Sequence, residues 1–170
     1  MSEPATRVIG LGNPLEGDDG LGLLALARLA DRFAFDPPVA FVDGGTWGLA
    51  LLPEIEGAER VLFLDAIRAG AAPGTLLALE GDAPPRRLSA KLSPHQIDLC
   101  EVLALAALRG SVPRHLLALG LEPAMLEFGA PLSPALAERL DDLVERAREE
   151  LEAWGHRATP REPTGRAARD

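Results

Sequence analysis

Apolar and polar positions alternate in blocks along the chain, and these blocks predict strands and helices in turn. Short apolar runs bounded by glycine, proline or aspartate are typical of buried strands, whereas longer apolar stretches favour helices. The pattern predicts strands at residues 7–11, 39–42, 60–64, 75–79 and 115–121. It predicts helices at residues 21–33, 49–55, 93–110 and 134–154. This alternation indicates an α/β fold of three layers, a mostly parallel sheet of five strands with helices on both faces.

The predicted helix at 134–154 has the clearest pattern. Its apolar residues recur on one stripe and its acidic residues lie elsewhere, which is typical of an amphipathic surface helix. Beyond it the chain holds four arginines among prolines and small residues, with little to bury. We therefore expect a single domain over residues 1–155, followed by a flexible tail over residues 156–170.

Charge and cysteine content narrow the range of partners. The 170 residues suit one domain, and their formal net charge is −9. An acidic chain has no overall attraction to nucleic acid or anionic lipid, and no apolar run is long enough to span a bilayer. The single cysteine excludes an internal disulfide and any zinc site built from several cysteines. We expect a cytoplasmic protein with neither a nucleic-acid nor a membrane partner.

Polar residues gather where the predicted strands end. Asp19 lies in the glycine-rich turn 10–20 after the first strand, residues 43–46 (Asp-Gly-Gly-Thr) follow the second, and Asp65 follows the third. His95 opens the helix that comes after the fourth strand. Open parallel sheets bind ligands at the carboxyl ends of their strands, so these groups are expected to meet at one edge. Two carboxylates and an imidazole suit a divalent first-row metal with coordination positions left open.

Each of these residues also has a simpler interpretation. Asp18 or Asp19 could cap the helix that begins near Gly20, because carboxylates suit a helix N-terminus. Asp65 could be a turn residue that binds backbone, and His95 could be an ordinary surface histidine. Nucleotide-binding fingerprints, the nucleophile elbow of hydrolases and the His-Glu-x-x-His zinc motif are all absent from the sequence.

Taken in order, the segments resemble the hydrogenase maturation endopeptidases, which trim the C-terminal extension from the large subunit of nickel–iron hydrogenases. The resemblance covers residues 7–152. It is carried by Gly-Leu-Gly-Asn-Pro-Leu-x-x-Asp-Asp-Gly at 10–20, Asp-Gly-Gly-Thr-x-Gly at 43–48, Leu-Asp-Ala at 64–66, Pro-Gly-Thr at 73–75, Ser-Pro-His-Gln at 93–96 and Gly-Leu-Glu-Pro at 120–123. The family fold implied is a twisted, mostly parallel five-stranded sheet between helices, in agreement with the strands predicted from the pattern.

The resemblance implies that Asp19, Asp65 and His95 contact nickel. This nickel belongs to the substrate, which already carries it when it is cut. In the isolated protein the site is then empty or filled by another divalent cation. Specificity would follow from a completed ligand set, because a precursor without nickel lacks the Lewis acid and is not held.

The remaining polar residues of the same edge receive less definite roles. Asp43 is a candidate general base or orienting group, and Gly44, Gly45 and Thr46 could present backbone amides to the substrate peptide. The implied partner is the precursor of a hydrogenase large subunit. A small protease that acts on one large partner is expected to be a monomer.

Two other functions stay open at this point. A non-catalytic chaperone that holds the precursor or its nickel would use the same three ligands. The opening Gly10–Pro14 also resembles that of peptidyl-tRNA hydrolases, but the catalytic histidine of that family is missing, since no histidine precedes His95. The acidic charge and the lack of a basic face argue against tRNA as well.

Overall fold

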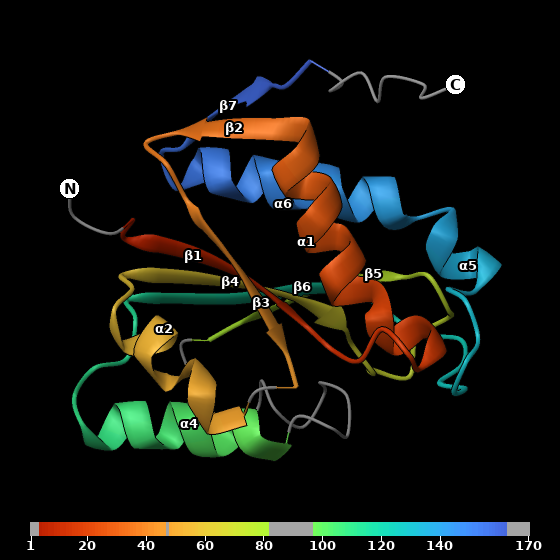
Figure 1. Ribbon diagram of the computed structural model, residues 1–170, viewed down its shortest axis with the longest axis horizontal. Helices are drawn as coiled ribbons and strands as arrows, with labels where there is room; N and C mark the ends of the chain where they lie inside the picture. The colour runs from red at the N-terminus through yellow and green to blue at the C-terminus, as the bar shows by residue number, and fades with distance from the viewer. Residues whose placement is uncertain (1–3, 47, 82–96, 163–170) are drawn as a thin grey trace, which may run out of the picture.

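The centre of the molecule is a five-stranded sheet with the order β3-β1-β4-β6-β5 (Figure 1). The structure is a computed structural model and describes residues 4–46, 48–81 and 97–162. The strands of the sheet are β1 (Thr6–Leu11), β3 (Ala40–Gly45), β4 (Arg60–Ala66), β5 (Leu76–Glu80) and β6 (His115–Leu121). Neighbouring strands are parallel except β5, which runs antiparallel to β6. The predicted α/β class and the mostly parallel five-stranded sheet are confirmed.

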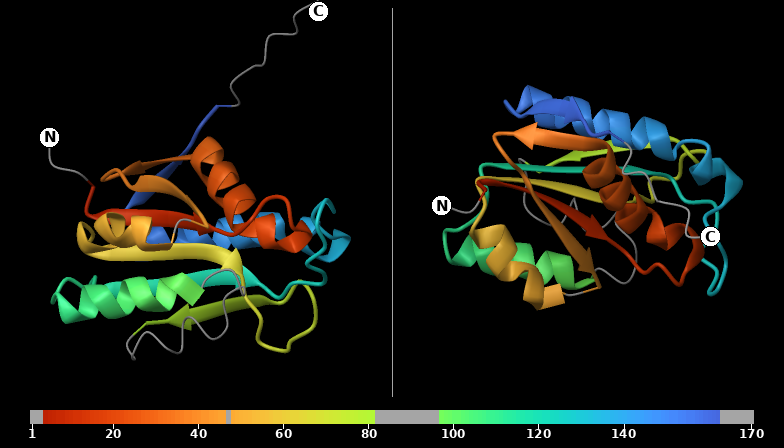
Figure 2. Two further views of the ribbon diagram at one scale, coloured as in Figure 1. Left: turned by 60° about the horizontal axis from the view of Figure 1, so that its bottom comes forward. Right: turned by 45° about the horizontal axis from the view of Figure 1, so that its top comes forward.

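Helices cover both faces of this sheet (Figures 1 and 2). One face carries α1 (Leu21–Arg32), α5 (Pro134–Ala137) and α6 (Leu140–Ala153). The other carries the 3₁₀ turn η2 (Gly48–Leu51), α2 (Leu52–Glu56) and α4 (Ile97–Leu108). Successive strand residues point to opposite faces, so Val8 and Leu62 join the core under α1 and α6, whereas Ile9 and Phe63 join the core over α2 and α4. Burial on both faces explains why these strands read as continuous apolar runs.

Two predicted helices differ from the observed ones in their boundaries. The expected helix at 49–55 is η2 followed by α2. Pro53 lies in the first turn of α2, where backbone N–H groups have no partner within the helix and proline, which lacks one, is tolerated. The expected helix at 134–154 is divided into α5 and α6. The predicted start of α4 at Ser93 and Pro94 lies outside the described residues, and α4 is described from Ile97. None of the described helices is both long and apolar enough to cross a membrane.

A second, two-stranded sheet was missed at the sequence level. We expected Phe33 to end the first helix, but it begins β2 (Phe33–Asp36), which pairs antiparallel with β7 (Arg157–Pro160). Phe33 and Phe35 are two positions apart, and residues at this spacing share one face of a strand. Their ring centroids are accordingly only 6.3 Å apart. Strands of four residues give too short a pattern to be distinguished from the end of a helix.

The second sheet also corrects the predicted tail, which does not begin at residue 156. The His156 side chain is 6% exposed, its Nδ1 donates to the Pro37 carbonyl over 2.7 Å, and its Nε2 lies 2.9 Å from Thr6 Oγ1. β7 follows directly, and the Arg161 backbone N–H donates to the Arg32 carbonyl over 2.8 Å. The chain is therefore held in place beyond residue 155. The rest of the predicted tail, from residue 163 on, lies outside the described residues.

Charged pairs join the exposed surfaces of α1 and α6. Arg28 and Arg32 both bind Asp141, at 2.9 and 3.3 Å, and Arg32 also binds Glu145 at 3.1 Å. On α6 itself, the hydrogen bond to Glu145 is the largest cause that raises the pKa of Arg148. Pairs as exposed as these contribute little to stability, so the apolar contacts beneath them hold the two helices together.

Candidate active site at the carboxyl edge of the sheet

The glycine-rich turn after β1 folds back on itself and positions Asp19. Gly12 has a φ of +117°, and a Cβ at this position would lie 1.9 Å from the backbone oxygen of Asp19. Only glycine fits such a contact. The Asn13 backbone N–H then donates to Asp19 Oδ2 over 2.8 Å, and the Gly12 N–H donates to the Gly45 carbonyl over 3.0 Å. The turn thereby joins the ends of β1 and β3 and leads through the 3₁₀ turn η1 (Gly17–Gly20) into α1.

A close approach of α1 to the sheet brings Asp19 to the end of β4. A Cβ at Gly22 would lie 2.2 Å from the Leu64 carbonyl oxygen and 2.3 Å from that of Leu11. Gly22 therefore allows the helix to touch the backbone at the ends of β4 and β1, and η1 also contacts β4. Asp65 comes directly after Leu64. The structure thus places Asp19 and Asp65 at the same edge of the sheet, on segments that touch.

Both carboxylates are fully buried, with 0% of each residue exposed. Asp65 lies inside β4, opposite Gly120 of β6, rather than just after the strand as the sequence pattern suggested. Asp19 Oδ1 is a buried oxygen with no hydrogen-bond partner in the described part of the chain. Leaving a buried carboxylate oxygen without a partner is costly, and native proteins do so mainly where a ligand or a reaction uses it. The donor set present therefore suits a cation.

The third predicted ligand, His95, lies outside the described residues. Within residues 4–46, 48–81 and 97–162, no group of three histidine, cysteine or acidic side chains is arranged to hold a metal ion. The described residues therefore include two of the three predicted ligands, and the metal role of all three stays a prediction.

Asp18 has a different role from its neighbour. Neither Asp18 nor Asp19 caps a helix through its side chain, so the capping interpretation is wrong. The Asp18 carboxylate instead accepts backbone N–H groups from Ala124 (2.7 Å), Met125 (3.1 Å) and Ser133 (2.7 Å), and the Ser133 hydroxyl (2.9 Å). It thus anchors the loop that follows β6. Sequence reasoning missed this role, because Asp18 and Ser133 are 115 positions apart and no local signal connects them.

The predicted substrate-binding segment lies at the end of β3. Asp43 is inside this strand, opposite Gly10 of β1, and its side chain is exposed. Gly44 is buried against β1, Gly45 is half-buried and Thr46 is exposed. Among the described residues, no hydrogen bond joins Asp43 to either buried aspartate. Asp43 is therefore reachable from solvent at the edge that holds them.

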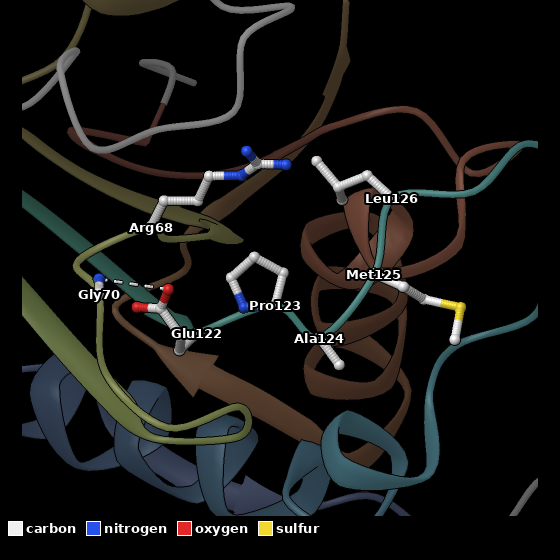
Figure 3. Close-up of a pocket in the computed structure, with 7 residues that line it drawn as sticks. All are labelled: Arg68, Gly70, Glu122, Pro123, Ala124, Met125 and Leu126. Atoms are coloured by element: carbon white, nitrogen blue, oxygen red, sulfur yellow. Dashed lines mark hydrogen bonds between the residues drawn. The ribbon is translucent and has the colours of Figure 1, made fainter.

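Sequence reasoning also missed a hollow beside this edge (Figure 3). Its volume is about 420 Å³, and it lies between Arg68 and Gly70 on one side and residues 122–126 on the other. Glu122, which is 7% exposed, accepts the Ala69 N–H at Oε2 over 2.7 Å and the Gly70 N–H at Oε1 over 3.3 Å. The only signal in the sequence is the segment 120–123, which carries part of the family resemblance but does not by itself indicate a cavity.

Comparison with known proteins assigns the family. The family model described as hydrogenase maturation protease matches residues 24–150. The hydrogenase expression/formation protein HoxM of Cupriavidus necator is 40% identical over 155 residues, which cover 90% of this chain and 77% of that protein. The hydrogenase 2 maturation protease of Escherichia coli is 32% identical, with 91% of this chain and 95% of that protein covered.

Solved structures agree with this assignment. The hydrogenase maturating endopeptidase HybD from E. coli superimposes with a TM-score of 0.86 at 31% identity, covering 92% of this chain and 97% of that one. The [NiFe] hydrogenase maturation protease HybD from Thermococcus kodakarensis gives a TM-score of 0.69 at 28% identity, covering 86% and 97%. The relatives and the structural neighbours are hydrogenase maturation proteases, so the chain is a peptidase by class. The chain belongs to the hydrogenase maturation protease family, which sets aside a non-catalytic chaperone and a peptidyl-tRNA hydrolase.

Proposed function

We propose that this protein is the endopeptidase that removes the C-terminal extension of a nickel–iron hydrogenase large-subunit precursor after nickel has been inserted. Asp19, Asp65 and His95 recognise the nickel that the precursor carries. The supporting observation is the pair of fully buried carboxylates on touching segments, with Asp19 Oδ1 lacking a hydrogen-bond partner in the described part of the chain.

A divalent cation is the group that best compensates for this burial. Removing a carboxylate from water costs several kcal/mol unless an opposite charge or hydrogen bonds replace the solvent. Two carboxylates and one imidazole leave coordination positions open, which the precursor's own ligands to nickel would occupy. A precursor without nickel brings no cation to offset the burial, so it is bound weakly and is not cut.

The peptide bond would be cleaved by water at the same edge. Asp43 is exposed there and is the candidate base that takes a proton from water, while the amine that leaves gains one. Gly44, Gly45 and Thr46 extend along the end of β3 and would bind the backbone of the peptide. The enzyme is proposed to act as a cytoplasmic monomer.

The experiment that tests this function compares two substrates and four enzymes. Purified wild type, Asp19→Asn and Asp65→Asn are mixed with nickel-loaded and with nickel-free precursor, and release of the extension is measured by mass spectrometry. Asp141→Asn is the matched control, because it removes the same charge from an exposed position on α6. We expect wild type and Asp141→Asn to trim only the nickel-loaded precursor, and the other two variants to trim neither.

Two results would contradict the proposal, in different ways. Equal trimming of both precursors by wild type would contradict nickel recognition, while the peptidase activity would stand. Trimming of neither precursor by wild type would show that this hydrogenase precursor is not the substrate.

A further inference from the structure

The hollow beside Arg68 (Figure 3) is walled by Ala124 and Met125, whose backbone N–H groups donate to the buried Asp18. Arg68 lies three residues beyond Asp65, after the end of β4, and Glu122 follows the end of β6. β4 and β6 are parallel neighbours, so both walls of the hollow continue strands of the central sheet. A peptide that is cut next to Asp65 therefore places residues close to the scissile bond within reach of this hollow.

The walls of the hollow are held in place before any ligand arrives. The Ile67 N–H donates to the Leu121 carbonyl over 3.0 Å, which ties the two walls together where they leave the sheet. Glu122 accepts the Ala69 N–H on one wall, and Asp18 accepts the Ala124 N–H on the other, each over 2.7 Å. A preformed site loses little conformational entropy when it binds a peptide.

Arg68 is the cation of this hollow. Its side chain is exposed and makes no ion pair or hydrogen bond within the described residues, although the chain has a net charge of −9. Glu122, the acidic residue that lines the hollow, forms no ion pair with Arg68. In Figure 3 the Glu122 carboxylate faces Gly70, whose N–H it accepts, and the Arg68 guanidinium extends toward Leu126. The guanidinium donors are therefore available to an incoming group.

The chemistry of the surroundings selects a carboxylate for this position. A guanidinium binds a carboxylate with two parallel hydrogen bonds. The rest of the edge is acidic, since Asp18, Asp19 and Asp65 are buried there. An acidic residue of the peptide is repelled along this edge and attracted at Arg68, which fixes the register of the chain. Met125, which is 45% exposed, adds an apolar wall for the neighbouring side chain.

We infer that the hollow between Arg68 and residues 122–126 is a subsite that binds a carboxylate in the C-terminal extension of the precursor. Arg68 is thus a specificity-determining residue for the peptide that is cut. This inference rests on the proposed function. The carboxylate belongs either to an acidic side chain of the extension or to the terminal carboxyl group of the precursor.

The first experiment measures steady-state trimming of nickel-loaded precursor by variants of Arg68. We expect Arg68→Ala to raise KM about fivefold with kcat unchanged, because an exposed ion pair is lost without a change at the reacting atoms. Arg68→Glu should raise KM further and Arg68→Lys less. Arg114→Ala and Arg114→Glu are the matched controls, since Arg114 is exposed at the opposite end of the sheet, and both should leave KM unchanged.

The second experiment identifies the source of the carboxylate. Each acidic side chain of the extension is changed in turn to its amide, and a separate precursor is lengthened by two glycines to displace its terminal carboxyl group. One of these changes should raise KM for wild type and have no effect on Arg68→Ala. If the carboxylate is a side chain, its replacement by lysine should restore trimming by Arg68→Glu.

The outcomes separate this inference from the function on which it rests. An unchanged KM for Arg68→Ala, or an equal effect of every precursor change on wild type and Arg68→Ala, would overturn the subsite while wild type still trims. Failure of wild type to trim any precursor would overturn the proposed function, and the subsite with it.

Discussion

The buried polar side chains at the two ends of the central sheet have different kinds of hydrogen-bond partner. At the amino end, side chains from distant elements bind one another. Arg7 Nε lies 3.0 Å from Glu54 Oε2, and His156 joins Thr6 to Pro37. These contacts connect β1 to α2, to the second sheet and to the turn before β3.

At the carboxyl end, the buried carboxylates bind backbone N–H groups instead. Asp18 accepts four hydrogen bonds from the loop after β6, Glu122 accepts two from the loop after β4, and Asp19 accepts one from its own turn. Three carboxylates thus shape three loops, and only Asp19 of these three keeps a buried oxygen without a partner among the described residues. Asp18 and Asp19 are equally buried, and they differ in that Asp18 accepts four hydrogen bonds whereas Asp19 accepts one from the described residues.

The largest expected effect comes from the acid with the most partners. Asp18→Ala leaves three backbone N–H groups and the Ser133 hydroxyl without their acceptor, so it should lower the free energy of unfolding by about 3–5 kcal/mol. Urea denaturation followed by circular dichroism measures this loss. A change below about 1 kcal/mol would show that the loop after β6 does not depend on Asp18.

Asp19→Asn should leave the free energy of unfolding nearly unchanged and abolish most of the trimming activity. The asparagine carbonyl can still accept the Asn13 N–H, and the variant loses a buried charge, so stability should stay within about 1 kcal/mol of wild type. Trimming of nickel-loaded precursor should fall more than about 100-fold, because a cation ligand is lost. Both quantities are measured on one preparation. A folded variant that trims at the wild-type rate would contradict the distinction between the two neighbouring aspartates.

Thr6→Val tests the amino end. It removes the hydroxyl that lies 2.9 Å from His156 Nε2 in a fully buried position, and should cost about 1–2 kcal/mol of stability. The kcat for trimming should not change, because the substitution is at the opposite end of the sheet from the acids. Thermal unfolding and trimming assays check the two parts. A fall in kcat for a variant with the stability of wild type would mean that the amino end of the sheet influences the chemistry at the carboxyl end.

Ser133→Ala should have the smallest effect in this series. It removes one of the four hydrogen bonds to Asp18 and keeps the backbone N–H, so the expected loss is about 1 kcal/mol. Urea denaturation of the single variants and of the double variant gives the coupling between Ser133 and Asp18. Strict additivity of the two substitutions would show that the hydroxyl is not bound to this carboxylate.

Much of the fold follows from the sequence for a physical reason. β1, β4 and β6 are central, buried on both faces, and appear in the sequence as uninterrupted apolar runs. β2 and β7 have four residues each and form a separate sheet, so their pattern was too short to predict. The place of Asp19 and Asp65 followed from the rule that ligands gather at strand ends. The anchor of Asp18 and the hollow at Arg68 did not, because both depend on contacts between distant segments.

A crystal structure of the enzyme in complex with nickel-loaded precursor, with nickel located by its anomalous scattering, would show whether Asp19 and Asp65 bind the metal. We expect a nickel peak about 2.0–2.2 Å from a carboxylate oxygen of Asp19 and from one of Asp65, the distance typical of a divalent metal bound by carboxylates. A nickel peak that both carboxylates fail to contact, in a complex with the extension bound along β3, would contradict this expectation.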